Sequence, residues 1–205
     1  MIDLLLAVGR MAGLGTAAGV RPSQTIAVLG MMHHLNAGVT LNPTFSFLGY
    51  WAVIIVFVVL AMVESAVDKI PRFDRVQGRL TMPYRVVMGG LAGASTIPYG
   101  WQGIVAGAAV AAFVAWFALH TKQLSRPKTL PSDAVLVLMS LWEDIASFFT
   151  ALVTLVFSPF GYLAVGFTAI VYFRTRFVRQ AKYRRMQRRG GVREGPVADG
   201  TLGEG

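Results

Sequence analysis

The chain is 205 residues long, 55% hydrophobic and only 14% charged, with a formal net charge of +9. A soluble domain of this length would have too few charged residues to cover its surface, so the composition excludes an ordinary soluble protein. Cysteine is absent, which excludes a disulfide framework, a thiolate metal site and a cysteine nucleophile. The basic residues lie mostly between or after apolar runs, and this placement favours anionic lipid headgroups over nucleic acid as their partners.

Seven apolar segments follow one another along the chain, at residues 2–20, 22–35, 46–68, 84–98, 101–120, 132–157 and 160–179. Proline and glycine separate them, for example at Arg21-Pro22 and Ser158-Pro159. A helix needs about 20 residues to cross a hydrocarbon core, so we expect the short segments 22–35 and 84–98 to be tilted or re-entrant. The first segment lacks the basic start and cleavage site of a signal peptide, and we expect it to be retained. The pattern predicts an all-α, polytopic helical membrane bundle over residues 1–179.

Basic residues predict the orientation of this bundle. They gather in regions 69–85, 122–128 and 174–189, whereas residues 36–45 carry no charge. Because Lys and Arg favour cytoplasmic loops, we expect a multi-pass protein of the inner (plasma) membrane with its C-terminus in the cytoplasm. We expect residues 180–189 to form a basic helix extension and residues 190–205 a disordered tail. The candidates for contact with anionic lipid headgroups are Arg174, Arg176, Arg179, Lys182, Arg184 and Arg185.

The two halves of the chain resemble each other in the order of their features. Residues 2–68 and 84–157 each contain a Gly-rich segment, a breaker, a further segment and a long acid-bearing segment, and residues 160–179 form an additional helix. Three segments per half would invert the second copy, as in transporters whose binding site lies near the bilayer midplane. We therefore predict two inverted repeats. The alternative, a chance likeness arising from ordinary membrane composition, stays open.

Small residues recur at a spacing of four, which lets helix backbones approach closely. We interpret these spacings as contacts within one bundle rather than as a dimer interface. The pairs are Gly9 and Gly13, Gly15 and Gly19, Gly89 and Gly93, and Gly103 and Gly107.

Two pairs of acids lie inside apolar segments, where an unpaired carboxylate costs several kcal/mol. Glu143 and Asp144 are adjacent, so their side chains point about 100° apart and meet different partners. Glu64 and Asp68 are four residues apart and share one helix face. We predict that these four acids form an ion or substrate pathway. For Asp68, which ends its segment, a simple charge at the membrane interface is the alternative.

Two interpretations of the acids remain open. They either bind protons or cations, or they form structural ion pairs with Arg10, Arg21 or His120. The Arg21-Pro22-Ser23 stretch resembles a helix start. If that turn lies within the membrane, Arg21 is a counter-charge to the acids; if it lies in the cytoplasm, Arg21 is an ordinary loop base.

Three stretches resemble a known family. They are Ala18-Gly19-Val20-Arg21-Pro22-Ser23-Gln24-Thr25, then Val63-Glu64-Ser65-Ala66-Val67-Asp68-Lys69-Ile70-Pro71, then Leu141-Trp142-Glu143-Asp144-Ile145-Ala146. Together they are similar to the bacterial membrane family called domain of unknown function 4126, over roughly residues 5 to 178. This resemblance implies a helical membrane protein and implies no substrate.

The sequence supports two hypotheses of function. The first is a small transporter or channel in which Glu64 and Glu143 bind protons or cations. The second is a non-transporting scaffold or accessory subunit that binds lipid, a second copy or another membrane protein. We expect no enzyme, because no nucleophile–base set or cofactor fingerprint is visible. We expect no metal site or cofactor either, since the adjacent His33 and His34 lack metal-ligand spacing.

Overall fold

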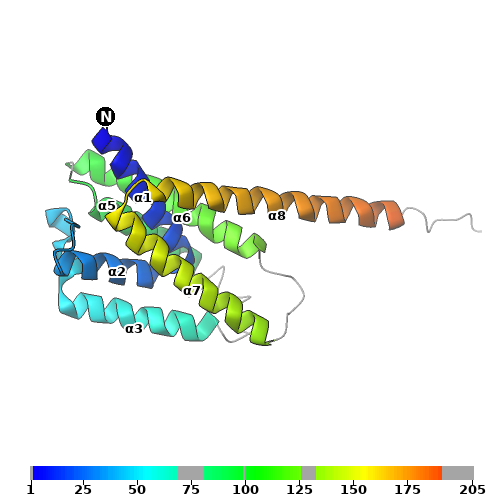
Figure 1. The fold of residues 1–205 in the computed structure, drawn as a ribbon, viewed down its shortest axis with the longest axis horizontal. Helices are drawn as coiled ribbons and strands as arrows, with labels where there is room; N and C mark the ends of the chain where they lie inside the picture. Colours follow the sequence, from blue (N-terminus) through cyan, green and yellow to red (C-terminus); the bar gives the residue numbers. More distant parts are fainter. Residues whose placement is uncertain (1, 69–80, 99, 126–132, 191–205) are drawn as a thin grey trace, which may run out of the picture.

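The computed structural model describes residues 2–68, 81–98, 100–125 and 133–190, except for the side chains of residues 133, 134, 136 and 182–190. These residues form seven α-helices and one 3-10 helix, with no strand among them (Figure 1). Four of the helices are long and apolar enough to cross a membrane, namely Ile2–Val20, Trp51–Asp68, Trp101–Ser125 and Val137–Val156. The prediction of a helical membrane bundle is confirmed. The predicted tail, from residue 191 onward, lies outside the described residues.

A proline divides the first two helices. Helix α1 (Ile2–Val20) stops before Arg21, whose φ of −140° and ψ of 83° are not helical. This break follows from sterics, because the ring of Pro22 disfavours helical geometry in the residue before it. The same ring is well suited to the first position of α2 (Pro22–His34), where no backbone N–H is needed. Arg21 is therefore held in the turn between two helices that run in different directions (Figure 1).

The connection from α2 to α3 is fixed to the second half of the chain. The 3-10 helix η1 (Pro43–Gly49) is capped by Asn42, whose side chain accepts a hydrogen bond from the backbone N–H of Thr44 at 3.0 Å. The same amide donates to the Ile97 carbonyl at 2.9 Å. Helix α3 (Trp51–Asp68) follows η1. One Asn side chain thus joins the loop before α3 to the end of α5.

The second half of the chain contains four helices: α5 (Met82–Ser95), α6 (Trp101–Ser125), α7 (Asp133–Val156) and α8 (Phe160–Gly190). Helix α6 continues five residues past the predicted end at residue 120 and includes Lys122. Helix α8 includes the predicted extension 180–189 and projects beyond the other helices (Figure 1). It is not among the four candidate spans, since Arg174 and Arg176 follow an apolar part of only about 21 Å.

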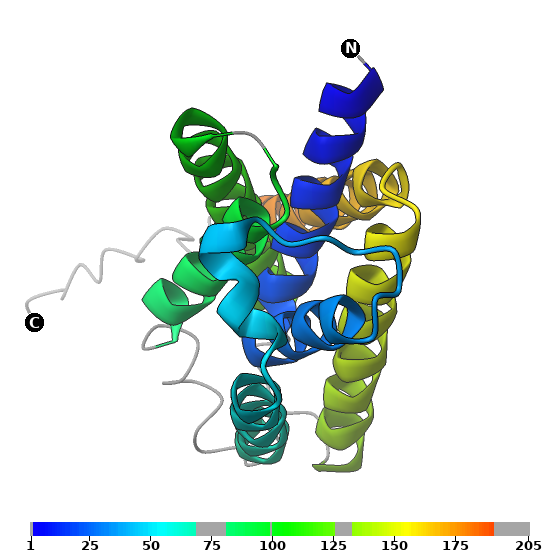
Figure 2. The same cartoon turned by 90° about the vertical axis from the view of Figure 1, so that its left-hand side faces the viewer.

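Helix α1 lies at the centre of the bundle (Figure 2). Over half of its apolar window is buried, 56% against 11% for α3, and it packs against α2, α5, α6, α7 and α8. Glycines allow these approaches. A Cβ atom on Gly13 would overlap the Thr154 side chain of α7, and one on Gly19 would overlap the Ala115 carbonyl of α6. The interpretation of such glycines as contacts within one bundle is confirmed for these positions.

Helices α2 and α5 contain 13 and 14 residues, which corresponds to about 20 Å, less than a hydrocarbon core of about 30 Å. Both lie against α1 and against each other. Whether they are tilted or re-entrant stays a prediction, as does the inverted repeat of residues 2–68 and 84–157.

Candidate functional site

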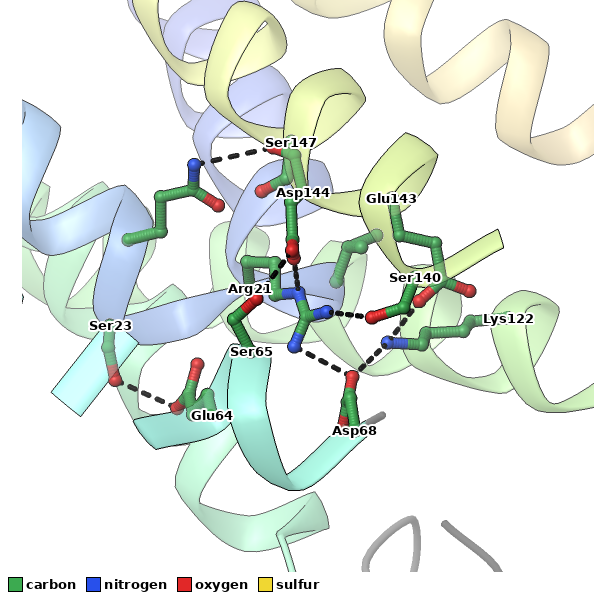
Figure 3. A network of polar contacts seen from close by, with 12 residues as sticks. Arg21, Ser23, Glu64, Ser65, Asp68, Lys122, Ser140, Glu143, Asp144 and Ser147 are labelled. Carbon is green, nitrogen blue, oxygen red and sulfur yellow. Dashed lines mark hydrogen bonds and ion pairs between the residues drawn. The ribbon is translucent and has the colours of Figure 1, made fainter. Parts of the chain in front are cut away.

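Arg21 is the centre of a buried polar cluster (Figure 3). Arg21 is only 1% exposed to solvent. The guanidinium forms ion pairs with Asp68 of α3, at 2.7 Å from Nη1 to Oδ2, and with Asp144 of α7 through Nε. Its Nη2 also donates a hydrogen bond to the Ser140 hydroxyl at 2.9 Å. Arg21 therefore joins the α1–α2 turn to both α3 and α7, and it is not an exposed loop base.

Lys122 of α6 extends this cluster, so that its charged residues come from α3, α6, α7 and the α1–α2 turn. Its Nζ lies 2.7 Å from Oε2 of Glu143 and 3.4 Å from Oδ2 of Asp68. The order of contacts is thus Asp144, Arg21, Asp68, Lys122, Glu143, with acids and bases alternating (Figure 3). We call these five residues the ion-pair chain. As predicted from their 100° separation, Glu143 and Asp144 meet different cations.

Three further polar side chains form hydrogen bonds at or near Asp144. The Ser65 hydroxyl donates to Oδ2 of Asp144 at 2.7 Å. Gln24 of α2 donates to the Asp144 backbone carbonyl at 3.3 Å, and Ser147, one turn further along α7, donates to the Ala17 carbonyl at 3.1 Å. These bonds hold α7 against α1, α2 and α3 beside the ion-pair chain.

Glu64 occupies a separate position, on the side of α3 that faces α2 and α5. Ser23 donates to its Oε1 at 2.8 Å, and the Ser23 oxygen lies 2.6 Å from the Tyr84 hydroxyl. The single Ser23 proton points to Glu64, so Tyr84 donates to Ser23. Among the described residues, the buried Oε2 atom of Glu64 has no hydrogen-bond partner. Glu64 also has no ion pair there, unlike Asp68, Glu143 and Asp144.

Arg85 of α5 is a second buried arginine, 3% exposed. Its Nη1 donates to the Gly19 carbonyl at 3.3 Å and to the Val20 carbonyl, both at the C-terminal end of α1. These carbonyls lack helical partners because α1 stops before Pro22, and a cation here also offsets the negative end of the helix dipole. Arg85 therefore stabilises the break that positions Arg21.

The ion-pair chain holds five charged groups together, two cations and three carboxylates. Arg85 and Glu64, on the neighbouring helices, add one charge of each sign. Moving each ion out of water costs several kcal/mol, and pairing repays that cost only for charges that have a partner. Each member of the ion-pair chain meets this condition, because it has at least one partner of opposite sign.

An open groove leads to one end of the ion-pair chain. It lies between α2, α3 and α7, has a volume of about 390 Å³ and is mostly apolar. Met31 and Met32 of α2, Met62 of α3 and Leu152 of α7 form part of its walls. Gln24, Ser65 and Asp144 are its polar lining. Asp144 therefore both pairs with Arg21 and lines a cavity.

The structure joins three of the four predicted acids, Asp68, Glu143 and Asp144, to the cations Arg21 and Lys122, whereas Glu64 bonds to Ser23 instead. Of the partners considered for the acids, Arg10 instead donates to the Ser158 hydroxyl at 3.2 Å, and His120 stacks on Trp116. Asp68 is 7% exposed and ion-paired, so it is not simply a charged residue ending a helix at the surface. The interpretation of Arg21 as an ordinary cytoplasmic base is wrong, because the residue is buried among α3 and α7.

Sequence reasoning missed Lys122 and Arg85. Both were counted among the cytoplasmic loop bases, yet Lys122 pairs with two acids and Arg85 caps α1. The signal for Lys122 was its position only two residues past an apolar segment that continues as helix. Ser23, Ser65 and Tyr84 were missed as well, since hydroxyl partners cannot be recognised from spacing alone.

The predicted headgroup contacts lie in α8. Arg174 and Arg176 are exposed, and Arg176 donates to the Tyr172 hydroxyl at 2.7 Å. Arg179 is partly exposed. The side chains of Lys182, Arg184 and Arg185 lie outside the described residues.

Comparison with known proteins identifies the family of this chain. No curated protein and no solved structure matches the chain. The family model described as Domain of unknown function (DUF4126) matches residues 8–177, which include every residue of the ion-pair chain and Glu64. The chain therefore belongs to this family, as the three sequence stretches around Arg21, Glu64 and Glu143 had indicated.

Proposed function

We propose that this membrane protein is a small transporter or channel in which buried carboxylates bind protons or cations. The observation that carries the proposal is the buried Oε2 atom of Glu64, which has no hydrogen-bond partner among the described residues. A buried carboxylate oxygen without a partner is costly, and a proton or a cation bound there would remove that cost. The acids of the neighbouring ion-pair chain support a role of this site in binding positive ligands.

Glu64 is the residue best suited to take up a proton. One of its oxygens accepts from Ser23 and the other has no hydrogen-bond partner among the described residues. A proton on this free oxygen would remove an unpaired charge from the protein interior. The hydroxyls of Ser23 and Tyr84 can each accept one proton and donate another, so they form a relay that could work in either direction.

The proposal includes a location and an orientation. We place the protein in the inner membrane with its C-terminus in the cytoplasm, supported by the basic residues of α8. Lys122 and Arg85 no longer support this orientation, because both are buried at the site. The support comes from the exposed Arg174 and Arg176 and from the bases in regions 69–79 and 126–128, whose structure is not described.

A flux assay in proteoliposomes tests the proposal. The protein is reconstituted, a pH gradient or a gradient of K⁺ or Na⁺ is imposed, and internal pH and cation content are followed. We expect Glu64→Gln and Glu143→Gln each to reduce the flux of wild type by about tenfold or more, which corresponds to 1.4 kcal/mol or more. Asp3→Asn is the matched control, since Asp3 is an exposed acid on α1. Wild-type flux in both glutamine variants would remove the roles assigned to these acids.

A second function is favoured by a separate observation. Helix α8 projects beyond the bundle (Figure 1). Its Arg174 and Arg176 side chains are exposed. In a scaffold or accessory subunit, this basic helix would hold anionic lipid headgroups, a second copy or another membrane protein. Replacing both arginines with Gln should then release a partner that co-purifies in stoichiometric amount, whereas Glu64→Gln should not. No loss of partner on arginine replacement would exclude this role.

A further inference from the structure

The groove between α2, α3 and α7 has the dimensions of a ligand site. Its volume of about 390 Å³ falls in the range of small-molecule pockets, about 300–1,000 Å³. The lining is almost entirely apolar, and methionines such as Met31 and Met62 contribute to it. Methionine side chains are flexible and polarisable, so they adapt to apolar ligands of different shapes. The walls therefore suit a hydrocarbon body better than a hydrated ion.

The polar part of the groove selects for positive charge. Asp144 is the one charged residue among those that line it, and its side chain is 18% exposed. The guanidinium of Arg21, which pairs with the same carboxylate, is only 2% exposed. Among the described residues of this pair, the groove is thus lined by the acidic member and not by the basic one. Ser65 and Gln24 add polar atoms on either side.

The apolar walls also limit the kind of ligand. A small hydrated ion would lose its water against these walls and would gain few polar partners in return, namely Asp144, Ser65 and Gln24. An anion would be repelled by Asp144. One negative residue beside long apolar walls thus points to an organic cation with a hydrocarbon part.

The surroundings of the groove favour entry from the lipid. Helices α3 and α7 are the two candidate spans with the smallest buried fractions, 11% and 22%. Met62, at the groove, is 68% exposed, and Phe148 is 39% exposed. In a bilayer these apolar surfaces face hydrocarbon. An amphipathic molecule already dissolved in the membrane can reach the groove without crossing water.

We propose that this groove binds an amphipathic organic cation of the alkylammonium class, with the ammonium at Asp144 and the hydrocarbon along Met31, Met62 and Leu152. The inference builds on the proposed function, because it names the chemistry of the cation. Binding in the groove itself does not require that the ligand be transported.

Three probes with one tail and different heads test the inference. Decylammonium, decanol and decyl sulfate share a decyl chain and differ in charge. Their equilibrium binding is measured with the wild-type protein in phosphatidylcholine nanodiscs, and binding to empty nanodiscs is subtracted. We expect decylammonium to bind at least tenfold more tightly than decanol, as expected for a hydrogen bond to a charged group, and decyl sulfate to bind most weakly. Equal affinities for decylammonium and decanol would overturn the inference.

Variants locate the binding site. Asp144→Asn should abolish the preference for decylammonium over decanol while both still bind. Ala61→Trp places a large side chain in the groove without changing its charges, and it should weaken both probes. Val63→Trp is the matched control, because Val63 lies two residues away on α3, is 52% exposed and does not line the groove. Equal binding in the two tryptophan variants would contradict the assigned location, even if Asp144→Asn failed to fold.

This experiment separates the inference from the proposed function. Selective decylammonium binding together with wild-type flux in Glu64→Gln and Glu143→Gln would keep the ligand site and reject those transport roles. Flux that depends on Glu64 without selective decylammonium binding would keep the transporter and reject this ligand class.

Discussion

Replacement of Arg21 by methionine tests the energetic role of the ion-pair chain. Arg21→Met keeps much of the side-chain volume and removes the cation, so Asp144 loses its ion pair and retains the Ser65 hydroxyl. Asp68 loses its 2.7 Å contact and retains Lys122 at 3.4 Å. Removing one partner of a buried ion pair costs about 3–5 kcal/mol, because a charge stays buried without compensation. Two carboxylates are affected here, so we expect a loss near the upper end of this range.

The assay is denaturant unfolding of the purified protein in detergent, followed by tryptophan fluorescence. Arg176→Met is the matched control, since Arg176 is exposed on α8, and its free energy of unfolding should stay close to wild type. The triple variant Arg21→Met, Asp68→Asn, Asp144→Asn should recover most of the lost free energy, because it leaves fewer unpaired charges. A loss below about 1 kcal/mol for Arg21→Met, or a triple variant as unstable as the single one, would refute the reasoning.

Three further predictions follow from individual contacts. Gly13→Ala should destabilise the fold by about 1–3 kcal/mol, because its Cβ atom would overlap Thr154. Gly166→Ala, which has open space around it, should instead stabilise α8 by about 0.5–1 kcal/mol. Thermal unfolding of both variants checks these opposite signs. Lys122→Met and Glu143→Gln should show a coupling of about 0.5–3 kcal/mol in a double-mutant cycle of unfolding free energies. If the two substitutions changed the unfolding free energy additively, Lys122 and Glu143 would not be in contact. Asn42→Ala should cost about 0.5–2 kcal/mol and accelerate hydrogen exchange of the Thr44 amide, while unchanged exchange would show that the cap is not formed.

The helices were predictable because their signals are local. An apolar run long enough to cross a bilayer is visible in any window of the sequence, and a proline such as Pro22 or Pro159 ends a helix for steric reasons that need no tertiary contact. The predicted breaks at Arg21-Pro22 and Ser158-Pro159 accordingly agree with the observed helix ends. The main difference, the longer α6, occurs where no proline or glycine marks an end before Ser125.

The acids of the site were predictable for a similar reason. A carboxylate in an apolar segment is expensive wherever the segment lies, so Glu64, Glu143 and Asp144 stand out without knowledge of the fold. Their partners do not stand out. Lys122 follows an apolar run and Arg85 follows a proline, and both positions are ordinary for cytoplasmic loop bases. Only the packing of α6 and α5 against α1 turns these two residues inward.

The groove could not be predicted either, since it depends on the relative placement of three helices. Met31, Met62 and Leu152 come from α2, α3 and α7, and each is unremarkable in its own apolar segment. The same holds for the hydrogen bond between Ser23 and Glu64, which are 41 residues apart, and for the one between Ser23 and Tyr84, which are 61 residues apart.

Structural and functional roles of the ion-pair chain can be separated because they depend on different features of it. The structural role depends on each charge having a neighbour of opposite sign, and the triple variant, with fewer unpaired charges than Arg21→Met, should meet that requirement better. The proposed function depends on carboxylates that can bind a cation, and the triple variant removes two of them, Asp68 and Asp144. It should therefore fold with most of the wild-type stability and yet show neither cation flux nor a preference for decylammonium. A folded triple variant that kept both activities would mean that these two carboxylates have no part in binding a cation.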